Sequence, residues 1–131
     1  MIVAAGTFTT TSRPEPPFAV EAGVMLGRME IDKVFHGQLE GTGSVHMTYV
    51  RTPVETSAGY VAVETISGVL DGREGSFVVL HVGLSERSES KLEVSIVPDA
   101  GTDQLAGITG SMVISEDLDG HQYTLNYRLP G

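Results

Sequence analysis

The dipeptide Asp71-Gly72 constrains the fold of this chain more than any other feature of the sequence. Runs rich in Val, Ile, Thr, Phe and Leu flank it on both sides, at residues 59–70 and 73–84. An Asp-Gly pair favours a tight two-residue turn with positive φ at both residues, and such a turn joins two antiparallel strands. The centre of the chain is therefore predicted to be a long β-hairpin.

The remainder of the sequence has the same character. Its 16 glycines interrupt short apolar runs, and no amphipathic pattern is long enough for a helix. Residues 12–23, with three prolines, are expected to form a loop or flap, and residues 98–110 an ordered loop. Strands are expected at residues 1–10, 29–39, 44–50, 59–70, 73–84, 91–97, 111–116 and 121–129. The fold class is all-β: a small eight-stranded antiparallel barrel, lipocalin-like in shape, in a single domain of residues 1–131.

The even-length turn at Asp71-Gly72 separates the side chains of the central hairpin into two faces. One face carries Ala62, Glu64, Ile66, Phe77, Val79 and His81, and the other carries Val61, Val63, Thr65, Val69, Val78, Leu80 and Val82. Both faces are apolar, so the one outside the barrel is expected to be covered by a flap or by a second subunit, which predicts a homo-oligomer. The sequence leaves open which face lines the lumen.

The preceding hairpin is expected to have a three-residue loop, residues 40–42, that pairs Leu39 with Gly43. This register places the apolar side chains of both strands on one face: Phe35, Leu39, Val45, Met47 and Tyr49. It also places His36 opposite His46. Zinc would need at least one further protein ligand, and none is nearby, so no metal site is predicted.

Composition and charge exclude several classes of function. The formal net charge is −9, which disfavours nucleic acid and anionic membranes as partners, and the chain contains no cysteine for thiol chemistry or thiolate metal sites. No apolar run is long enough to span a membrane, and no signal peptide pattern is present at the start. We expect a cytoplasmic protein without a cofactor.

Several segments together resemble a bacterial domain-of-unknown-function family, number 3224. The central signature is Gly68-Val-Leu-Asp-Gly-Arg-Glu-Gly-Ser-Phe-Val-Val-Leu-His-Val-Gly83, preceded by Phe35-His-Gly-Gln-Leu-Glu-Gly41 and Tyr60-Val-Ala-Val-Glu64, and followed by Pro98-Asp-Ala-Gly-Thr-Asp-Gln-Leu-Ala-Gly107 and His121-Gln-Tyr-Thr-Leu-Asn-Tyr127. The resemblance implies a small antiparallel barrel similar in shape to allene oxide cyclase. It implies no catalytic residues, and fold alone does not give function.

Glu64 and His81 are the candidate catalytic pair, because the predicted register makes them diagonal neighbours across two strands. In the lumen, the carboxylate would orient the imidazole as a general acid/base unit; the alternative is a structural hydrogen bond. The candidate ligand-binding residues are Phe35, Met47, Tyr49, Phe77, Tyr123 and Tyr127.

The predicted function is binding of a small hydrophobic or oxygenated metabolite in the barrel cavity. In addition to binding this metabolite, the chain could act on it as a cofactor-free isomerase or cyclase. The alternatives are a non-catalytic lipocalin-like carrier and a structural barrel that only assembles into an oligomer.

Overall fold

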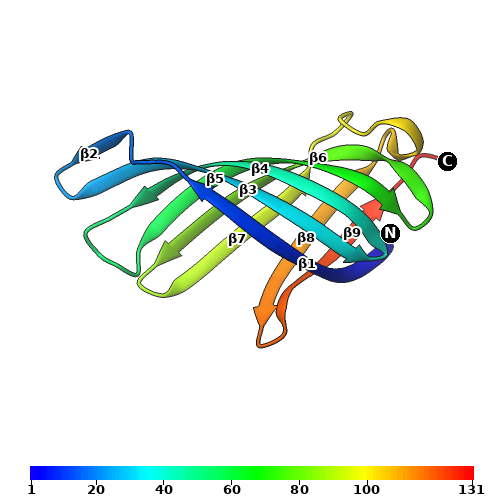
Figure 1. Cartoon of the computed structure of the whole chain (residues 1–131). Coiled ribbons are helices and arrows are strands. Elements are labelled where there is room, and N and C mark those ends of the chain that lie inside the picture. Colours follow the sequence, from blue (N-terminus) through cyan, green and yellow to red (C-terminus); the bar gives the residue numbers. More distant parts are fainter.

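The computed structural model describes residues 1–131, and most of them belong to β-strands (Figure 1). The strands are β1 (Ile2–Pro14), β2 (Ala19–Glu21), β3 (Val24–Gly37), β4 (Leu39–Arg51), β5 (Ala58–Leu70), β6 (Arg73–Glu86), β7 (Glu89–Ile96), β8 (Thr109–Asp117) and β9 (Gly120–Arg128). The only helical segment is the short 3-10 helix η1 (Asp103–Leu105). The predicted all-β class is confirmed.

The sheet closes on itself through β1. This strand pairs with β9 along one edge and with β3 along the other, so that β1 and β3 to β9 form a closed antiparallel barrel of eight strands. β2 is an additional short strand that pairs only with the beginning of β3. The predicted eight-stranded barrel is therefore confirmed, with one extra strand at its rim.

The central hairpin forms as predicted. Asp71 and Gly72 have φ values of 49° and 82°, the positive values that a two-residue hairpin turn of this kind needs. Ala62 lies opposite His81, as the even-length turn requires. Glu64, Ile66, Phe77 and Val79 are buried on the same face as His81. This face lines the interior of the barrel, which decides the question that the sequence left open.

The turn between β3 and β4 differs from the predicted one. Gly43 lies opposite Lys33 rather than Leu39, and the chain reverses around Gly37 and Gln38. Gly37 takes a φ of 116°, and its N–H group donates a 2.9 Å hydrogen bond to the Glu40 carboxylate. The shift from position 39 to position 33 is an even number of residues, so every side chain keeps its predicted face.

Other strand boundaries also differ from the prediction: β3 begins at Val24 instead of residue 29, and β4 at Leu39 instead of residue 44. β1 continues to Pro14, through residues expected to be a loop, because Arg13 forms ion pairs with Glu30 and Asp32 on β3. For the last hairpin the sequence predicts a turn at Asp119-Gly120, but the chain turns at Leu118-Asp119, since Asp117 pairs with Gly120.

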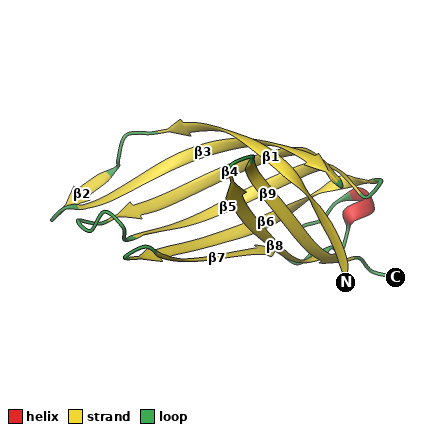
Figure 2. Ribbon diagram, turned by 90° about the horizontal axis from the view of Figure 1, so that it is seen from below, coloured by secondary structure: helices red, strands yellow, loops and turns green.

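The two ends of the barrel are built differently. At the end near both termini, η1 and the loop around it cover the opening, and Leu105 and Ile108 are buried there (Figure 2). Gly75 leaves space for this segment, because a Cβ at that position would lie 2.3 Å from the Thr102 carbonyl oxygen and 3.2 Å from the Leu105 side chain. β2 lies at the opposite end, which η1 does not cover (Figure 2). Large side chains fill the covered half: Phe35, Leu39, Ile66, Leu70, Phe77, Tyr123, Leu125 and Tyr127.

Candidate functional site

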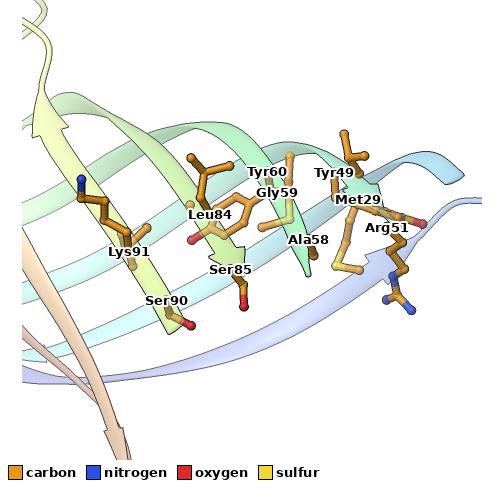
Figure 3. Close-up of a pocket in the computed structure, with 14 residues that line it drawn as sticks. Met29, Tyr49, Arg51, Ala58, Gly59, Tyr60, Leu84, Ser85, Ser90 and Lys91 are labelled. Carbon is orange, nitrogen blue, oxygen red and sulfur yellow. The ribbon is translucent and has the colours of Figure 1, made fainter. Parts of the chain in front are cut away.

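The uncovered half of the barrel holds two pockets in succession. The mouth pocket, of about 420 Å³, lies at the rim between β4, β5, β6 and β7 (Figure 3). The inner pocket, of about 230 Å³, lies deeper. Met47, Tyr60 and Leu92 line both pockets, so the two are consecutive parts of one lumen.

Two tyrosines stay against the wall of the mouth pocket because each lies across a glycine of the neighbouring strand. Tyr49 is paired with Gly27, and Tyr60 is paired with Gly83. A Cβ at either glycine would lie 2.3 Å from the tyrosine ring. The missing side chains therefore give the rings space at the wall, where Figure 3 shows both tyrosines beside the pocket. Burial raises the pKa of Tyr60 above its usual value.

A cluster of three ionisable side chains lies at the base of the inner pocket. We call Lys33, Glu64 and His81 the triad; they come from β3, β5 and β6. Glu64 Oε1 lies 3.1 Å from Lys33 Nζ and 2.7 Å from His81 Nε2. Glu64 is fully buried, while Lys33 and His81 are 7% and 4% exposed. Lys33 and His81 line the pocket, so the carboxylate lies behind the two nitrogen-bearing groups.

The Glu64 carboxylate fits only because Gly43 faces it. A Cβ at Gly43 would lie 2.3 Å from Glu64 Oε2. Oε2 itself is the one fully buried side-chain oxygen or nitrogen without a hydrogen-bond partner. Both hydrogen bonds of the carboxylate are thus made through Oε1, which fixes Lys33 and His81 relative to each other.

The side wall of the inner pocket contains aromatic groups. The Lys33 ammonium lies 4.7 Å from the centre of the Phe8 ring, a cation–π distance. The His121 ring stacks on Phe8, with 5.0 Å between the ring centres, and lines the same pocket. Polar side chains therefore form the floor of the inner pocket, and its walls are largely apolar or aromatic. This is the usual composition of a small-molecule site.

The predicted catalytic pair, Glu64 and His81, is brought into direct contact. Of the predicted ligand-binding residues, Met47 and Tyr49 line the mouth pocket. The other four lie in the filled half and line neither pocket: Phe35, Phe77, Tyr123 and Tyr127.

The two core tyrosines have their hydroxyl groups occupied by the protein. The Tyr123 hydroxyl accepts a 2.9 Å hydrogen bond from the Leu39 N–H group and donates to the His36 carbonyl. The Tyr127 hydroxyl donates to the Asp71 carboxylate. Burial, together with this hydrogen bond, raises the pKa of Tyr127 to about 12.

His36 and His46 do not face each other, because the turn before β4 differs from the predicted one. His36 Nδ1 lies 3.3 Å from the Glu40 carboxylate, and His46 lies opposite Glu30. No group of three or more His, Asp or Glu side chains is arranged to hold a metal ion.

Lys33 and His121 are the site residues that the sequence analysis missed. Lys33 has the same strand parity as Phe35, so its inward orientation could have been inferred from the alternation. Its partner Glu64 comes from another hairpin, and no local pattern joins the two positions. His121 directly follows the last hairpin turn, a position at which the sequence predicts exposure, whereas in the structure it lines the inner pocket.

Taken together, the chain is a small closed antiparallel β-barrel with one filled end, one open end and a buried ionic triad between them. Its sequence matches the model of the protein family of unknown function DUF3224 over residues 4–127, and the chain belongs to that family. It is similar to the crystal structure of a DUF3224 protein of unknown function from Shewanella oneidensis MR-1, with a TM-score of 0.94 and 38% identity. That match covers 100% of this chain and 98% of the other.

Two negative findings complete the comparison. No curated protein matches the sequence. The structure contains no helix with the length and apolar character needed to cross a bilayer.

Proposed function

We propose that this protein binds a small, mostly apolar molecule with an oxygen function in the open half of its barrel. The observation that carries the proposal is the continuous lumen, in which an apolar mouth pocket leads to an inner pocket with the triad at its base. The volume of the mouth pocket, about 420 Å³, lies within the usual ligand-site range of ~300–1,000 Å³. A ligand would place its apolar part between Met29, Met47 and Leu92.

Cofactor-free isomerase or cyclase chemistry is the second candidate function, and the Glu64–His81 contact favours it over a pure carrier. A carboxylate that holds an imidazole beside a pocket is a common arrangement for proton transfer. The similarity in shape to allene oxide cyclase that the family resemblance implies stays a prediction. A carrier without turnover would need the pockets but not the triad.

The binding proposal is tested with N-phenyl-1-naphthylamine, a neutral apolar dye that fluoresces when it leaves water. We expect the wild-type protein to bind the dye. Met47→Trp should weaken binding by about tenfold or more, a loss of at least ~1.4 kcal/mol, because Met47 lines both pockets and indole would fill their junction. Thr48→Trp is the matched control, since Thr48 is the next residue on β4 and points to the outside.

Absence of dye binding by the wild-type protein would contradict the proposal, and so would equal binding by wild type and Met47→Trp. Native mass spectrometry of the freshly purified protein provides an independent measurement. A retained small organic molecule would support an open lumen and identify its chemical class.

We also propose that the protein forms a homo-oligomer through the outer face of β5 and β6, and that it acts in the cytoplasm. Six apolar side chains on this face are between 40% and 62% exposed: Val61, Val63, Val69, Leu80, Val82 and Leu84. Where β5 and β6 pair, the only charged side chain on this face is Glu74, opposite Val69 near the Asp71-Gly72 turn, although the chain carries a net charge of −9. A second copy placed there would oppose apolar surface to apolar surface and keep the carboxylates apart.

A further inference from the structure

The triad is unusual because its ionic groups lie in an otherwise apolar interior. Removing an ion pair from water costs several kcal/mol per ion, and apolar residues of similar volume would often give equal or greater stability. Lys33 and Glu64 form such a pair, with their side chains 8% and 0% exposed. Stability therefore does not explain why the barrel interior contains these ionic groups, whereas a chemical role would explain it.

The hydrogen bond to Glu64 determines where the proton of neutral His81 lies. A carboxylate only accepts hydrogen bonds, so Nε2 carries the proton and donates to Oε1 across 2.7 Å. Nδ1 then holds a lone pair and has no partner in the protein. Glu64 Oε2 is the only fully buried side-chain nitrogen or oxygen without a hydrogen-bond partner, so Nδ1 is not fully buried. His81 lines the inner pocket. Nδ1 is therefore placed to take a proton from a molecule in that pocket.

Lys33 supplies a positively charged hydrogen-bond donor beside the His81 imidazole. Its ammonium has three N–H groups, and the contact with Glu64 Oε1 uses one of them. Lys33 Nζ and His81 Nε2 both contact this single oxygen, so they are separated by no more than two consecutive hydrogen bonds. One small ligand can therefore reach the Lys33 ammonium and the His81 imidazole together.

We propose that the triad catalyses proton transfer at the carbon next to a carbonyl group, and that its substrates are apolar, enolisable ketones or aldehydes. This inference rests on the proposed function, since the substrate must first bind in the lumen. Lys33 Nζ donates to the carbonyl oxygen, and His81 Nδ1 removes a proton from the adjacent carbon. Glu64 does not touch the substrate; it is a positioning residue that holds the imidazole and stabilises its protonated form.

The step balances without a co-reactant. The C–H electron pair becomes the new C=C bond, the electron pair of the C=O bond moves to oxygen, and the proton resides on His81. The resulting enolate oxygen is stabilised by the Lys33 ammonium. Return of the proton to the same carbon exchanges hydrogen, and return to a more distant carbon of a conjugated enolate moves a double bond.

The charge of the triad favours a neutral carbonyl over a carboxylate ligand. Lys33 and Glu64 compensate each other, so with neutral His81 the triad has no net charge. A ligand carboxylate would add an uncompensated negative charge close to Glu64 in a poorly solvated place. A carbonyl oxygen requires only the hydrogen bond that Lys33 can give.

The test is hydrogen–deuterium exchange of 2-undecanone in D₂O, followed by the loss of the proton signals beside the carbonyl in NMR spectra. We expect wild type to accelerate exchange over buffer. His81→Gln should reduce the acceleration by about 100-fold or more, the usual contribution of a general base. His46→Gln is the matched control, because His46 lies exposed on β4 beside Glu30 and lines neither the mouth pocket nor the inner pocket, and it should retain exchange.

Displacement of N-phenyl-1-naphthylamine by 2-undecanone is measured on the same samples. Lys33→Met should weaken binding of the ketone while leaving binding of the dye, because only the ketone has an oxygen to anchor. Glu64→Gln should lower the exchange rate without weakening displacement, which separates positioning from substrate contact. Circular dichroism spectra establish that each variant is folded.

The wild-type protein decides the proposal even if a triad variant fails to fold. Displacement of the dye without accelerated exchange would overturn the proton-transfer proposal and leave the binding function intact. Equal acceleration by wild type and a folded His81→Gln would also overturn it. Failure to bind either the dye or the ketone would overturn the proposed function and this inference together.

Discussion

At the scale of single residues, the interior shows how one carboxylate can be tolerated among apolar side chains. Glu64 is fully buried, and it is stabilised by two donors on one oxygen and by the space left at Gly43. Each partner is itself held by its own strand, so the arrangement depends on three strands being in register. Loss of one partner should therefore cost more than loss of the pair.

We predict that Lys33→Met lowers the free energy of unfolding by about 3–5 kcal/mol, because it leaves the Glu64 charge buried without its cation. The double variant Lys33→Met/Glu64→Gln should recover most of this loss, since neither charge remains. Urea unfolding of the wild type, both single variants and the double variant measures the coupling. Additive effects of the two substitutions would contradict a coupled pair.

The raised pKa of Tyr127 predicts a specific loss of stability at alkaline pH. The folded protein keeps this hydroxyl protonated up to about pH 12, whereas the unfolded chain loses the proton near pH 10. The stabilisation is therefore complete below pH 10 and disappears as the pH rises to about 12. Tyr127→Phe should show a smaller fall in unfolding free energy over this interval than wild type.

Tyr49→Phe is the control for this titration, because it also removes one phenol but leaves the bond between Tyr127 and Asp71. Its alkaline unfolding should follow that of wild type. An unchanged pH dependence in Tyr127→Phe would show that this hydroxyl is not the responsible group.

At the scale of strands, paired glycine and tyrosine positions shape the open end. Tyr49 and Tyr60 lie on adjacent strands and are themselves paired, and each uses the space above a glycine on its other side. A barrel of eight strands has an interior that side chains can fill, as they do in the half covered by η1. The glycines keep two large rings at the wall and thereby leave the mouth open.

Gly83→Ala should partly close the mouth pocket. The new methyl group would lie 2.3 Å from the Tyr60 ring, so the ring must move away from the wall. We expect binding of N-phenyl-1-naphthylamine to weaken by about tenfold, or ~1.4 kcal/mol. Gly59→Ala, at the same mouth pocket, serves as the control, because its methyl group would meet the end of the Leu84 side chain at 3.2 Å and the Gly83 carbonyl oxygen at 3.7 Å but no tyrosine ring. Unchanged binding by folded Gly83→Ala would contradict this role of the glycine.

At the scale of the whole molecule, the barrel presents two different apolar surfaces. One is the lumen, filled at the end near the termini and open at the other (Figure 2). The other is the outer face of β5 and β6, which no flap or other segment of the chain covers, since its valines and leucines are exposed. The lumen is the proposed ligand site, and the outer face is the proposed contact between copies.

Val63→Glu and Leu80→Glu should each reduce the mass of the assembly in light scattering, because two copies would bring the new carboxylates together in an apolar contact. Val113→Glu is the control: Val113 is also an exposed apolar residue, at 59%, but it lies on β8. A wild-type protein with the mass of one chain would contradict the oligomer proposal. The oligomer proposal would also be contradicted if all three variants kept the mass of wild type.

The sequence by itself determined the eight strands of the barrel and the faces of their side chains, but not β2 or η1. Asp71-Gly72 specifies its turn through local backbone preferences, so the register of β5 and β6 and the nearness of Glu64 and His81 follow from adjacent residues. The turn near Gly37 was displaced in the prediction because several glycines there allow alternative turns. The side chains of β3 and β4 were still assigned to the correct faces, since the alternation along a strand depends only on whether a residue number is odd or even.

Only the tertiary structure decided which face is inside and what meets there. Closure of the barrel through β1 turns one side of every strand inward at once, and this is a property of all eight strands together. Lys33 reaches Glu64 for the same reason: the two residues are 31 positions apart and belong to strands separated by β4. Which half is filled depends on where η1 packs, and the contacts that hold it there come from residues distant in sequence.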